Sequence, residues 1–227
     1  MSATTERFIS GGHTITADVF APVSAGRHPA VLILHGTFGL LPPFGADIIS
    51  FGQFLEAKGI VAVIPHYFER TNTAAGPPGP TMLEELPAWR TACADALQFV
   101  RVHSAINAGR LGMIGFSLGG NLALELAMNP PSGVTLKAIV DFFGPTIAPP
   151  VHGNRAALPP VLIHHGADDA IVPIENSLRL VQELRAAGRT QGLGYEFITY
   201  PGQGHGFVGP ALVASRASTV DFLSGIL

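Results

Sequence analysis

The sequence predicts an α/β fold in which helices cover both faces of a mostly parallel β-sheet. Along its 227 residues, short apolar runs of strand length alternate with amphipathic runs of helix length, and glycine- or proline-rich turns separate them. Apolar residues make up 47% of the chain and charged residues only 13%, so both faces of a sheet can be buried. This length suits one domain over residues 1–227, with no separate lid domain.

The predicted elements begin with an antiparallel pair, Phe8–Ser10 and Thr14–Phe20, which turns at two glycines. The apolar runs after this pair are the expected buried strands: Val31–Leu34, Ile60–Ile64, Leu111–Ile114, Lys137–Asp141, Val161–His165 and Tyr195–Tyr200. The amphipathic runs are the expected helices: Ile48–Lys58, Pro87–Val102, Gly120–Ala127, Glu175–Ala187 and Ala211–Leu223. Gly59 is expected to end the first helix, and Pro87 suits the first turn of the second.

Two proline- and glycine-rich stretches, Asn72–Pro80 and Thr146–Leu158, are expected to be loops. Both follow a predicted strand at its carboxyl end, which is the edge where an open α/β sheet places its ligand site. They therefore either wall a pocket at that edge or serve as plain connections.

A serine stands at the turn between the predicted strand Leu111–Ile114 and the predicted helix Gly120–Ala127. Residues 115–119 read G-F-S-L-G and match the G-x-S-x-G pattern, and the strand and helix around them are the context of a nucleophile elbow. Such a turn is tight and strained, so a side chain in place of either glycine is expected to collide with the strand–helix crossing. Ser117 is therefore the candidate nucleophile, and the N–H of Leu118 is a candidate donor to an oxyanion.

An elbow serine needs a histidine to take its proton and an acid to orient that histidine. Of nine histidines, His205 alone lies between glycines after the last predicted strand, which favours it as the general base. The histidines that close the strand Val161–His165 are expected in the core. The candidate acids are Asp169, beside a turn-capping Asp168, and Asp141 at the end of an earlier strand.

With these segments in place, the chain resembles the dienelactone hydrolase family of α/β-hydrolases. The matching pieces occur in the family's order and span nearly the whole chain: Leu34–Leu40, Pro65–Arg70, Gly115–Gly120, Gly166–Pro173 and Gly204–Phe207. The resemblance implies an α/β-hydrolase fold and ester or lactone hydrolysis without a cofactor. It places the acid on Asp169, the base on His205 and the second oxyanion donor on the backbone N–H of Thr37. Asp141 stays the rival acid, because some α/β-hydrolases draw their acid from that earlier strand.

Two departures from the best-known members of the family agree with each other chemically. Those members carry a cysteine where this chain has Ser117 and a glutamate where it has Gly36; a thiolate needs such a partner, whereas a serine that works through a histidine does not. Arg70 aligns with an arginine that holds a substrate carboxylate, and the family's second basic residue has no counterpart here. Aromatic candidates for an apolar substrate pocket, or for the core, are Phe38, Phe68, Trp89, Phe116 and Phe207.

The composition argues against several other classes of function. A net charge of −3 and an isoelectric point near 6.3 disfavour binding to nucleic acid or to an anionic membrane. The N-terminus shows no signal-peptide pattern, and no apolar run is long enough to span a bilayer. The lone Cys93 fits a reducing compartment, so the cytoplasm is expected. No histidine or cysteine spacing indicates a metal, and the G-x-G-x-x-G match at residues 204–209 is followed by neither an acidic ribose partner nor another strand–helix unit.

We therefore expect a serine hydrolase that cleaves carboxylic esters or lactones through an acyl-enzyme on Ser117. It is expected to be a monomer or small homo-oligomer whose partner is a small-molecule substrate. Thioester, peptide or phosphotriester hydrolysis would use the same groups and stays an alternative. A ligand-binding relative that has kept the fold without catalysis is a further alternative.

Overall fold

The computed structural model describes residues 3–77, 79–146 and 155–227, and within them eight strands form one sheet. The strands are β1 (Thr4–Ser10), β2 (His13–Phe20), β3 (His28–Leu34), β4 (Val61–Pro65), β5 (Ile106–Phe116), β6 (Leu136–Phe142), β7 (Val161–Gly166) and β8 (Tyr195–Tyr200). Their order across the sheet is β1-β2-β4-β3-β5-β6-β7-β8. Strand β2 runs antiparallel to both β1 and β4, and the other neighbours are parallel. The prediction of a mostly parallel sheet is confirmed.

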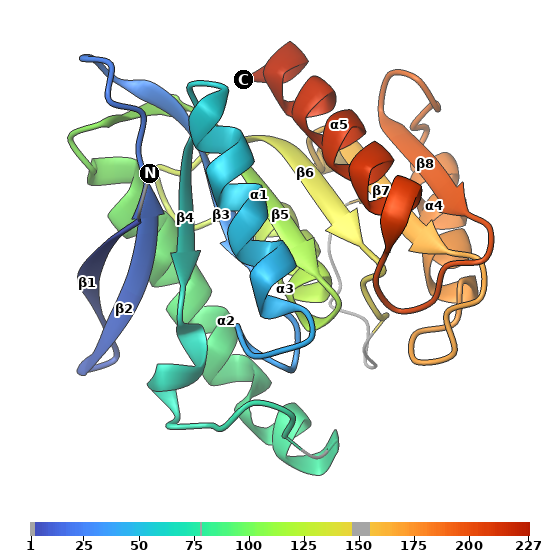
Figure 1. Ribbon diagram of the computed structural model, residues 1–227, viewed down its shortest axis with the longest axis horizontal. Helices are drawn as coiled ribbons and strands as arrows, with labels where there is room; N and C mark the ends of the chain where they lie inside the picture. Colours follow the sequence, from blue (N-terminus) through green and yellow to red (C-terminus); the bar gives the residue numbers. More distant parts are fainter. Residues whose placement is uncertain (1–2, 78, 147–154) are drawn as a thin grey trace.

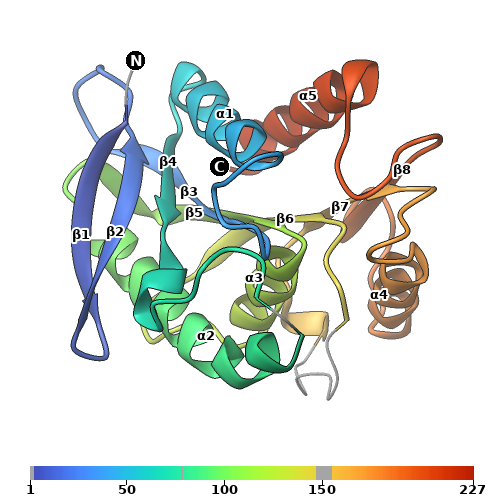
Figure 2. The same ribbon diagram turned by 60° about the horizontal axis from the view of Figure 1, so that its bottom comes forward.

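Five α-helices of the described residues cover the two faces of this sheet. They are α1 (Gly45–Ala57), α2 (Gly79–Val102), α3 (Leu118–Met128), α4 (Glu175–Ala186) and α5 (Gly209–Ile226). Helices α1 and α5 lie on one face, and α2, α3 and α4 lie on the other (Figures 1 and 2). Two short 3-10 helices, η1 (Tyr67–Arg70) and η2 (Arg155–Ala157), complete the helical segments. The predicted covering of both faces is thus confirmed.

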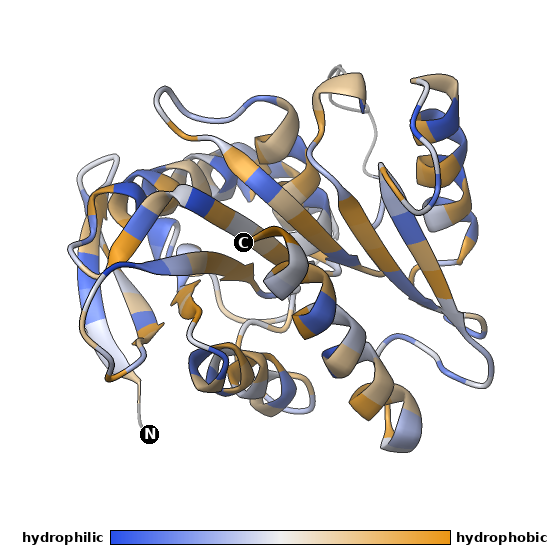
Figure 3. Ribbon diagram, turned by 90° about the horizontal axis from the view of Figure 1, so that it is seen from above, coloured by the Kyte–Doolittle hydropathy of each residue, from blue (hydrophilic) through white to orange (hydrophobic). Residues whose placement is uncertain are grey.

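Apolar side chains form two buried layers, one on each face of the sheet. The layer under α2 and α3 includes Trp89 and Leu122, and the layer under α1 and α5 includes Phe51 and Leu223. Central strands contribute to both layers, so residues 30–34 of β3 are all buried. The hydropathy colouring accordingly shows mostly hydrophobic ribbon along the middle of the sheet (Figure 3).

The helix predicted to start at Pro87 begins two turns earlier. Helix α2 starts at Gly79, so Pro87 lies inside it rather than in its first turn. A proline inside a helix removes one backbone donor. However, Met82 and Leu86 pack against the core on the same stripe as Trp89, and this burial extends the helix toward the N-terminus.

The two predicted loops differ in how far the structure describes them. The last two residues of the predicted loop Asn72–Pro80 belong to α2, which begins at Gly79. Within the loop, the N–H of Gly76 donates to the carbonyl of Thr37 at 2.7 Å. This bond ties the loop to the segment that follows β3. In Thr146–Leu158, residues 147–154 lie outside the described residues, and the 3-10 helix η2 follows them.

Candidate active site

The turn after β5 holds Ser117 in a strained backbone conformation. Its φ is +54° and its ψ is −118°, a region that residues other than glycine rarely occupy. The Ser117 N–H donates to the carbonyl of Phe142 at 2.9 Å, and α3 begins at the next residue. A Cβ built on Gly115 would overlap the carbonyl of Gly119. The glycines of the pattern therefore let the strand turn sharply into the helix and leave the serine at the carboxyl edge of the sheet.

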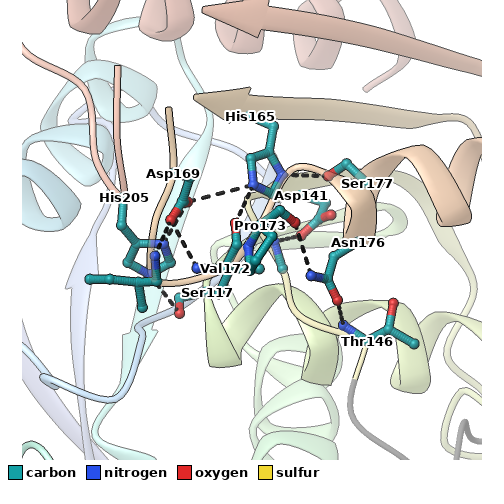
Figure 4. Close-up of polar contacts among 12 residues, drawn as sticks. Ser117, Asp141, Thr146, His165, Asp169, Val172, Pro173, Asn176, Ser177 and His205 are labelled. Carbon is teal, nitrogen blue, oxygen red and sulfur yellow. Dashed lines mark hydrogen bonds and ion pairs between the residues drawn. The ribbon is translucent and has the colours of Figure 1, made fainter. Parts of the chain in front are cut away.

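His205 lies in the segment after β8, with its ring beside the serine. Its Nε2 is 2.9 Å from the Ser117 Oγ, and its Nδ1 is 2.8 Å from the Asp169 Oδ2 (Figure 4). In the neutral imidazole, Nδ1–H donates to the carboxylate and Nε2 accepts the serine O–H. The ring can therefore take the serine proton while the carboxylate stabilises the positive charge that forms.

The acid in contact with His205 is Asp169, which follows β7. Its Oδ1 accepts the N–H groups of Ile171 and Val172, each at 2.9 Å, and its side chain is fully buried. Its neighbour Asp168 is exposed. Three hydrogen bonds, counting the one from His205, therefore fix the orientation of the Asp169 carboxylate.

The rival acid, Asp141, lies at the end of β6 and is fully buried. Its Oδ1 accepts the N–H of Gly144 at 3.1 Å, while its Oδ2 has no partner among the described residues. Burial raises the pKa of this carboxyl group to about 7, and the Gly144 hydrogen bond lowers it in part. The His205 Nδ1–H donates to Asp169 instead, so the geometry favours Asp169 as the acid.

His165, at the end of β7, holds the turn that carries Asp169. Its Nε2 is 2.8 Å from the Val172 carbonyl oxygen and its Nδ1 is 2.6 Å from the Ser177 Oγ on α4. Because the Val172 carbonyl can only accept, Nε2–H donates to it and Nδ1 accepts the serine O–H. Burial lowers the pKa of His165, which favours this neutral ring. The Nε2 also lies 3.5 Å from the Asp169 Oδ2, so one imidazole links the acid's turn to α4.

The segment after β3 lies directly against the nucleophile. A Cβ built on Gly36 would come within 3.2 Å of the Ser117 Cβ, which places the backbone of Gly36 and Thr37 beside the serine. The N–H groups of Thr37 and Leu118 donate to no other residue in the described part of the chain. Both are therefore free to donate to an oxyanion that forms on a carbonyl attacked by Ser117.

His35 supports this segment from inside the core. Its ring stacks on Tyr67 with centroids 4.0 Å apart, and its Nδ1 is 2.8 Å from the Gly36 carbonyl oxygen. The Tyr67 hydroxyl donates to the His35 carbonyl at 2.7 Å. Burial lowers the pKa of His35 to about 4, so the ring stays neutral and positions the backbone rather than moving protons.

An apolar cavity opens beside Ser117 and His205, between α1 and α5. We call it the phenylalanine pocket after the seven phenylalanines that line it: Phe38, Phe44, Phe51, Phe116, Phe142, Phe143 and Phe207. Phe38 is 42% exposed and lies at the mouth, whereas Phe116 and Phe207 are buried. Such a lining favours an apolar part of a ligand next to the serine.

Three of the candidate pocket residues, Phe68, Trp89 and Arg70, do not line this pocket. Trp89 is fully buried under α2, where its Nε1–H donates to the Thr71 Oγ1 at 2.8 Å and Phe68 packs on its ring. The Arg70 guanidinium lies against Gly11 at the β1–β2 turn. Phe68 and Trp89 thus take the core role that the sequence left open for them, and Arg70 lies outside this pocket, because sequence does not show on which side of the sheet a side chain packs.

Sequence analysis missed the other four phenylalanines of the pocket. Phe142 ends β6 and Phe143 follows it, at the same sheet edge as Ser117, so the rule that sites lie at carboxyl ends of strands could have found them. Phe44 precedes α1 as its N-cap and Phe51 lies in the middle of that helix, so both reach the pocket only through helix packing. The described residues of Asn72–Pro80 and Thr146–Leu158 do not line it.

The described residues contain no cluster of three or more histidine, cysteine, aspartate or glutamate side chains arranged to hold a metal ion. Over the same ranges, no helix combines the length and the apolarity needed to cross a bilayer.

A strained serine between a strand and a helix, with a histidine and an acid on segments after later strands, defines an α/β-hydrolase. The order of the three residues along the chain, serine, acid and histidine, is also that of this class.

The chain belongs to the dienelactone hydrolase family, whose model matches residues 15–218. A probable 2-oxo-3-(5-oxofuran-2-ylidene)propanoate lactonase of Bradyrhizobium sp is 25% identical over 212 residues, which are 87% of this chain and 81% of the relative. A carboxymethylenebutenolidase of Rhodococcus opacus is 28% identical over 206 residues, which are 88% of this chain and 78% of the relative. The resemblance seen in the motifs is thus confirmed.

Solved structures share the same fold. A putative dienelactone hydrolase from Klebsiella pneumoniae subsp. pneumoniae MGH 78578 superposes with a TM-score of 0.79 and 22% identity, covering 98% of both chains. A dienelactone hydrolase-like promiscuous phosphotriesterase from metagenomic libraries gives a TM-score of 0.81 with 20% identity, covering 100% of this chain and 99% of the other. At these identities the likeness concerns the fold.

Proposed function

We propose that this carboxylic ester hydrolase cleaves esters or lactones through an acyl-enzyme on Ser117. The Ser117 Oγ attacks the substrate carbonyl carbon while the His205 Nε2 takes the serine proton. Asp169 keeps the imidazole in the required orientation and stabilises its cationic form. The backbone N–H groups of Thr37 and Leu118 donate to the oxyanion of the tetrahedral intermediate.

When the intermediate collapses, the His205 Nε2–H protonates the departing alkoxide and the acyl group stays on the Ser117 Oγ. In a lactone, the released hydroxyl remains attached to the acyl group. His205 then takes a proton from a water molecule that attacks the acyl-enzyme, and the carboxylic acid leaves as Ser117 recovers its proton.

One observation carries this proposal above the others. A continuous chain of hydrogen bonds runs from the Ser117 Oγ through His205 to Asp169, at 2.9 and 2.8 Å, beside an apolar pocket. The family and its relatives, named for lactonase and carboxymethylenebutenolidase activities, support the same class of reaction.

The remaining aspects of the proposal rest on the sequence. The enzyme acts as one domain on a small molecule without a cofactor, as a monomer or small homo-oligomer. A net charge of −3 supports the absence of nucleic-acid or membrane partners. The lone, buried Cys93 supports a reducing compartment such as the cytoplasm.

The test measures whether Ser117 is an activated nucleophile. Wild type, Ser117→Ala and His205→Ala are treated with a fluorophosphonate, and their intact masses are measured by mass spectrometry. Hydrolysis of short 4-nitrophenyl esters and of a neutral phosphotriester is assayed in parallel. We expect one adduct on wild type alone, and ester turnover that is lost in both variants.

The opposite results have distinct meanings. No adduct and no turnover in folded wild type would overturn the proposal and favour a ligand-binding role. Turnover of the phosphotriester above that of every carboxylic ester would replace the proposed substrate class while leaving Ser117 as nucleophile.

A further inference from the structure

We propose that the phenylalanine pocket accepts only an uncharged substrate group, and that the Asp47–Arg216 ion pair at its edge sets this preference. The inference rests on the proposed function and specifies its substrate class as neutral esters or lactones without a carboxylate in the pocket. It separates this chain from the Bradyrhizobium relative, whose name denotes a propanoate.

The first observation is that the pocket has no cationic side chain to receive an anion. All 13 lysines and arginines of the sequence lie in the described residues. None of them lines the pocket. A substrate carboxylate next to the phenylalanines would therefore find no lysine or arginine partner in its lining.

The arginine of α5, Arg216, is already paired with an acid. The Arg216 Nη2 lies 2.9 Å from the Oδ1 of Asp47, an α1 residue that lines the pocket. The Arg216 guanidinium also stands over the rings of Phe51 and Phe54, with its Cζ 5.6 and 5.4 Å from their centroids. Of the two paired side chains, the one that lines the pocket is therefore Asp47, and Arg216 offers no unpaired cation to a bound anion.

The arginine expected to hold a carboxylate is directed elsewhere. Arg70 closes the 3-10 helix η1, and its guanidinium lies against Gly11 at the β1–β2 turn, at the edge strand of the sheet. The serine follows β5, with β4 and β3 between it and that edge pair. The carboxylate contact that the family resemblance assigns to Arg70 is thus missing from this pocket.

Desolvation converts these observations into selectivity. An ionised carboxylate that leaves water for an apolar cavity without a partner loses far more free energy than its neutral ester does. We therefore expect kcat/KM for a substrate with a carboxylate in the pocket to be at least about 100-fold below that of its methyl ester.

Two matched substrate pairs test this expectation, one for each side of the scissile bond. The acyl-side pair is the mono-4-nitrophenyl ester of adipic acid and its methyl ester, followed by release of 4-nitrophenolate. The alcohol-side pair is 4-acetoxybenzoate and methyl 4-acetoxybenzoate, followed by release of the phenol. Each kcat/KM is divided by the rate of hydroxide-catalysed hydrolysis, which removes intrinsic reactivity. Calorimetric binding of the same four compounds to Ser117→Ala gives a readout that does not require turnover.

The outcomes separate this inference from the proposed function. A 100-fold preference for the neutral member of at least one pair supports both. Equal turnover within each pair overturns the neutral-substrate inference and leaves the hydrolase intact. Absence of turnover with selective binding of the neutral members overturns the hydrolase and supports the neutral pocket. Absence of turnover without such selectivity overturns both.

The ion pair is tested by changing its charge. Asp47→Asn removes the carboxylate from the pocket wall and leaves Arg216 uncompensated, so the neutral-to-anionic ratio should fall about tenfold. Glu183→Gln is the matched control, because it removes the acid of another arginine pair, with Arg155 at 2.8 Å, on α4 of the opposite face. A ratio that falls only in Asp47→Asn supports the assignment, whereas an unchanged ratio in Asp47→Asn overturns the role of the ion pair.

Discussion

Asp141 and Asp169 are two buried acids near the carboxyl ends of adjacent strands, yet their surroundings differ sharply. Asp169 accepts hydrogen bonds from two backbone N–H groups and from His205. Asp141 accepts one, from Gly144, and its second oxygen has no partner among the described residues. Figure 4 shows both acids beside the elbow. The one that meets His205 also has the better-satisfied carboxylate.

The difference follows from where each acid stands relative to its strand. Asp141 lies within β6, paired in register with Gly115 on β5 and Ile163 on β7, so the neighbouring backbone groups are committed to the sheet. Asp169 lies in the turn after β7, where successive N–H groups have no strand partner and point toward its carboxylate. A turn can surround an anion with donors, whereas a central strand leaves few to offer.

Exchange of each acid for its amide is expected to separate the two positions most strongly. Asp169→Asn removes the charge that stabilises the imidazolium and disturbs the tautomer, so kcat should fall roughly 10,000-fold. Asp141→Asn should keep kcat within about threefold of wild type, because Asp141 makes no contact with His205. Steady-state assays with a short 4-nitrophenyl ester measure both. The reverse pattern would make Asp141 the acid.

Asp141 is expected to make stability fall as pH rises. Its folded pKa, raised by burial to about 7, exceeds the unfolded value of 3.8, so the folded state holds an extra proton between these values. Stability from this group is complete below the unfolded pKa, declines through the window and is lost above the folded pKa. The loss approaches roughly 4 kcal/mol in the free energy of unfolding.

Urea unfolding of wild type and Asp141→Asn at several pH values measures this effect. The variant cannot titrate at this position, so its stability relative to wild type should rise from about pH 4 to about pH 7. A constant difference between the two proteins across that range would show that Asp141 is ionised in the folded state.

His165→Asn should weaken the support of Asp169. The shorter side chain cannot bond Val172 and Ser177 at the same time, as the imidazole does, so the turn that carries Asp169 loosens. We expect kcat to fall roughly 10- to 100-fold with little change in KM. His164→Asn is the control, since His164 is equally buried on the same strand but bonds to Thr219 and Tyr200. An equal loss of kcat in both variants would reduce His165 to a packing role.

Ser177→Ala should give the smallest effect in this series. It removes only the O–H that His165 Nδ1 accepts at 2.6 Å, and the ring keeps its bond to Val172. We expect a loss of about 1 kcal/mol in the free energy of unfolding and at most a threefold loss in kcat, roughly the share of one hydrogen bond. Thermal unfolding and the same ester assay measure both quantities. A loss of kcat as large as that of His165→Asn would mean that Ser177, not the imidazole, holds the turn.

Sequence alone determined the features whose geometry is decided within a few residues. The alternation of apolar strands and amphipathic helices predicted the parallel sheet, and the glycines around Ser117 predicted a turn that only such residues permit. The glycines on both sides of His205 predicted it as the base, and its ring lies beside Ser117. The predicted start of α2 at Pro87 was wrong: the helix begins at Gly79, because burial of Met82 and Leu86 outweighs a local proline signal.

Tertiary structure alone decided the features that depend on which face of the sheet a side chain enters and what it meets there. From the sequence, Asp141 and Asp169 were both candidate acids, and only the folded chain brings one of them, Asp169, into contact with His205. Trp89 packs under α2, whereas Phe51 reaches the pocket from α1, although both are aromatic residues on amphipathic helices. Packing between segments far apart in the chain makes these choices, and no local pattern records it.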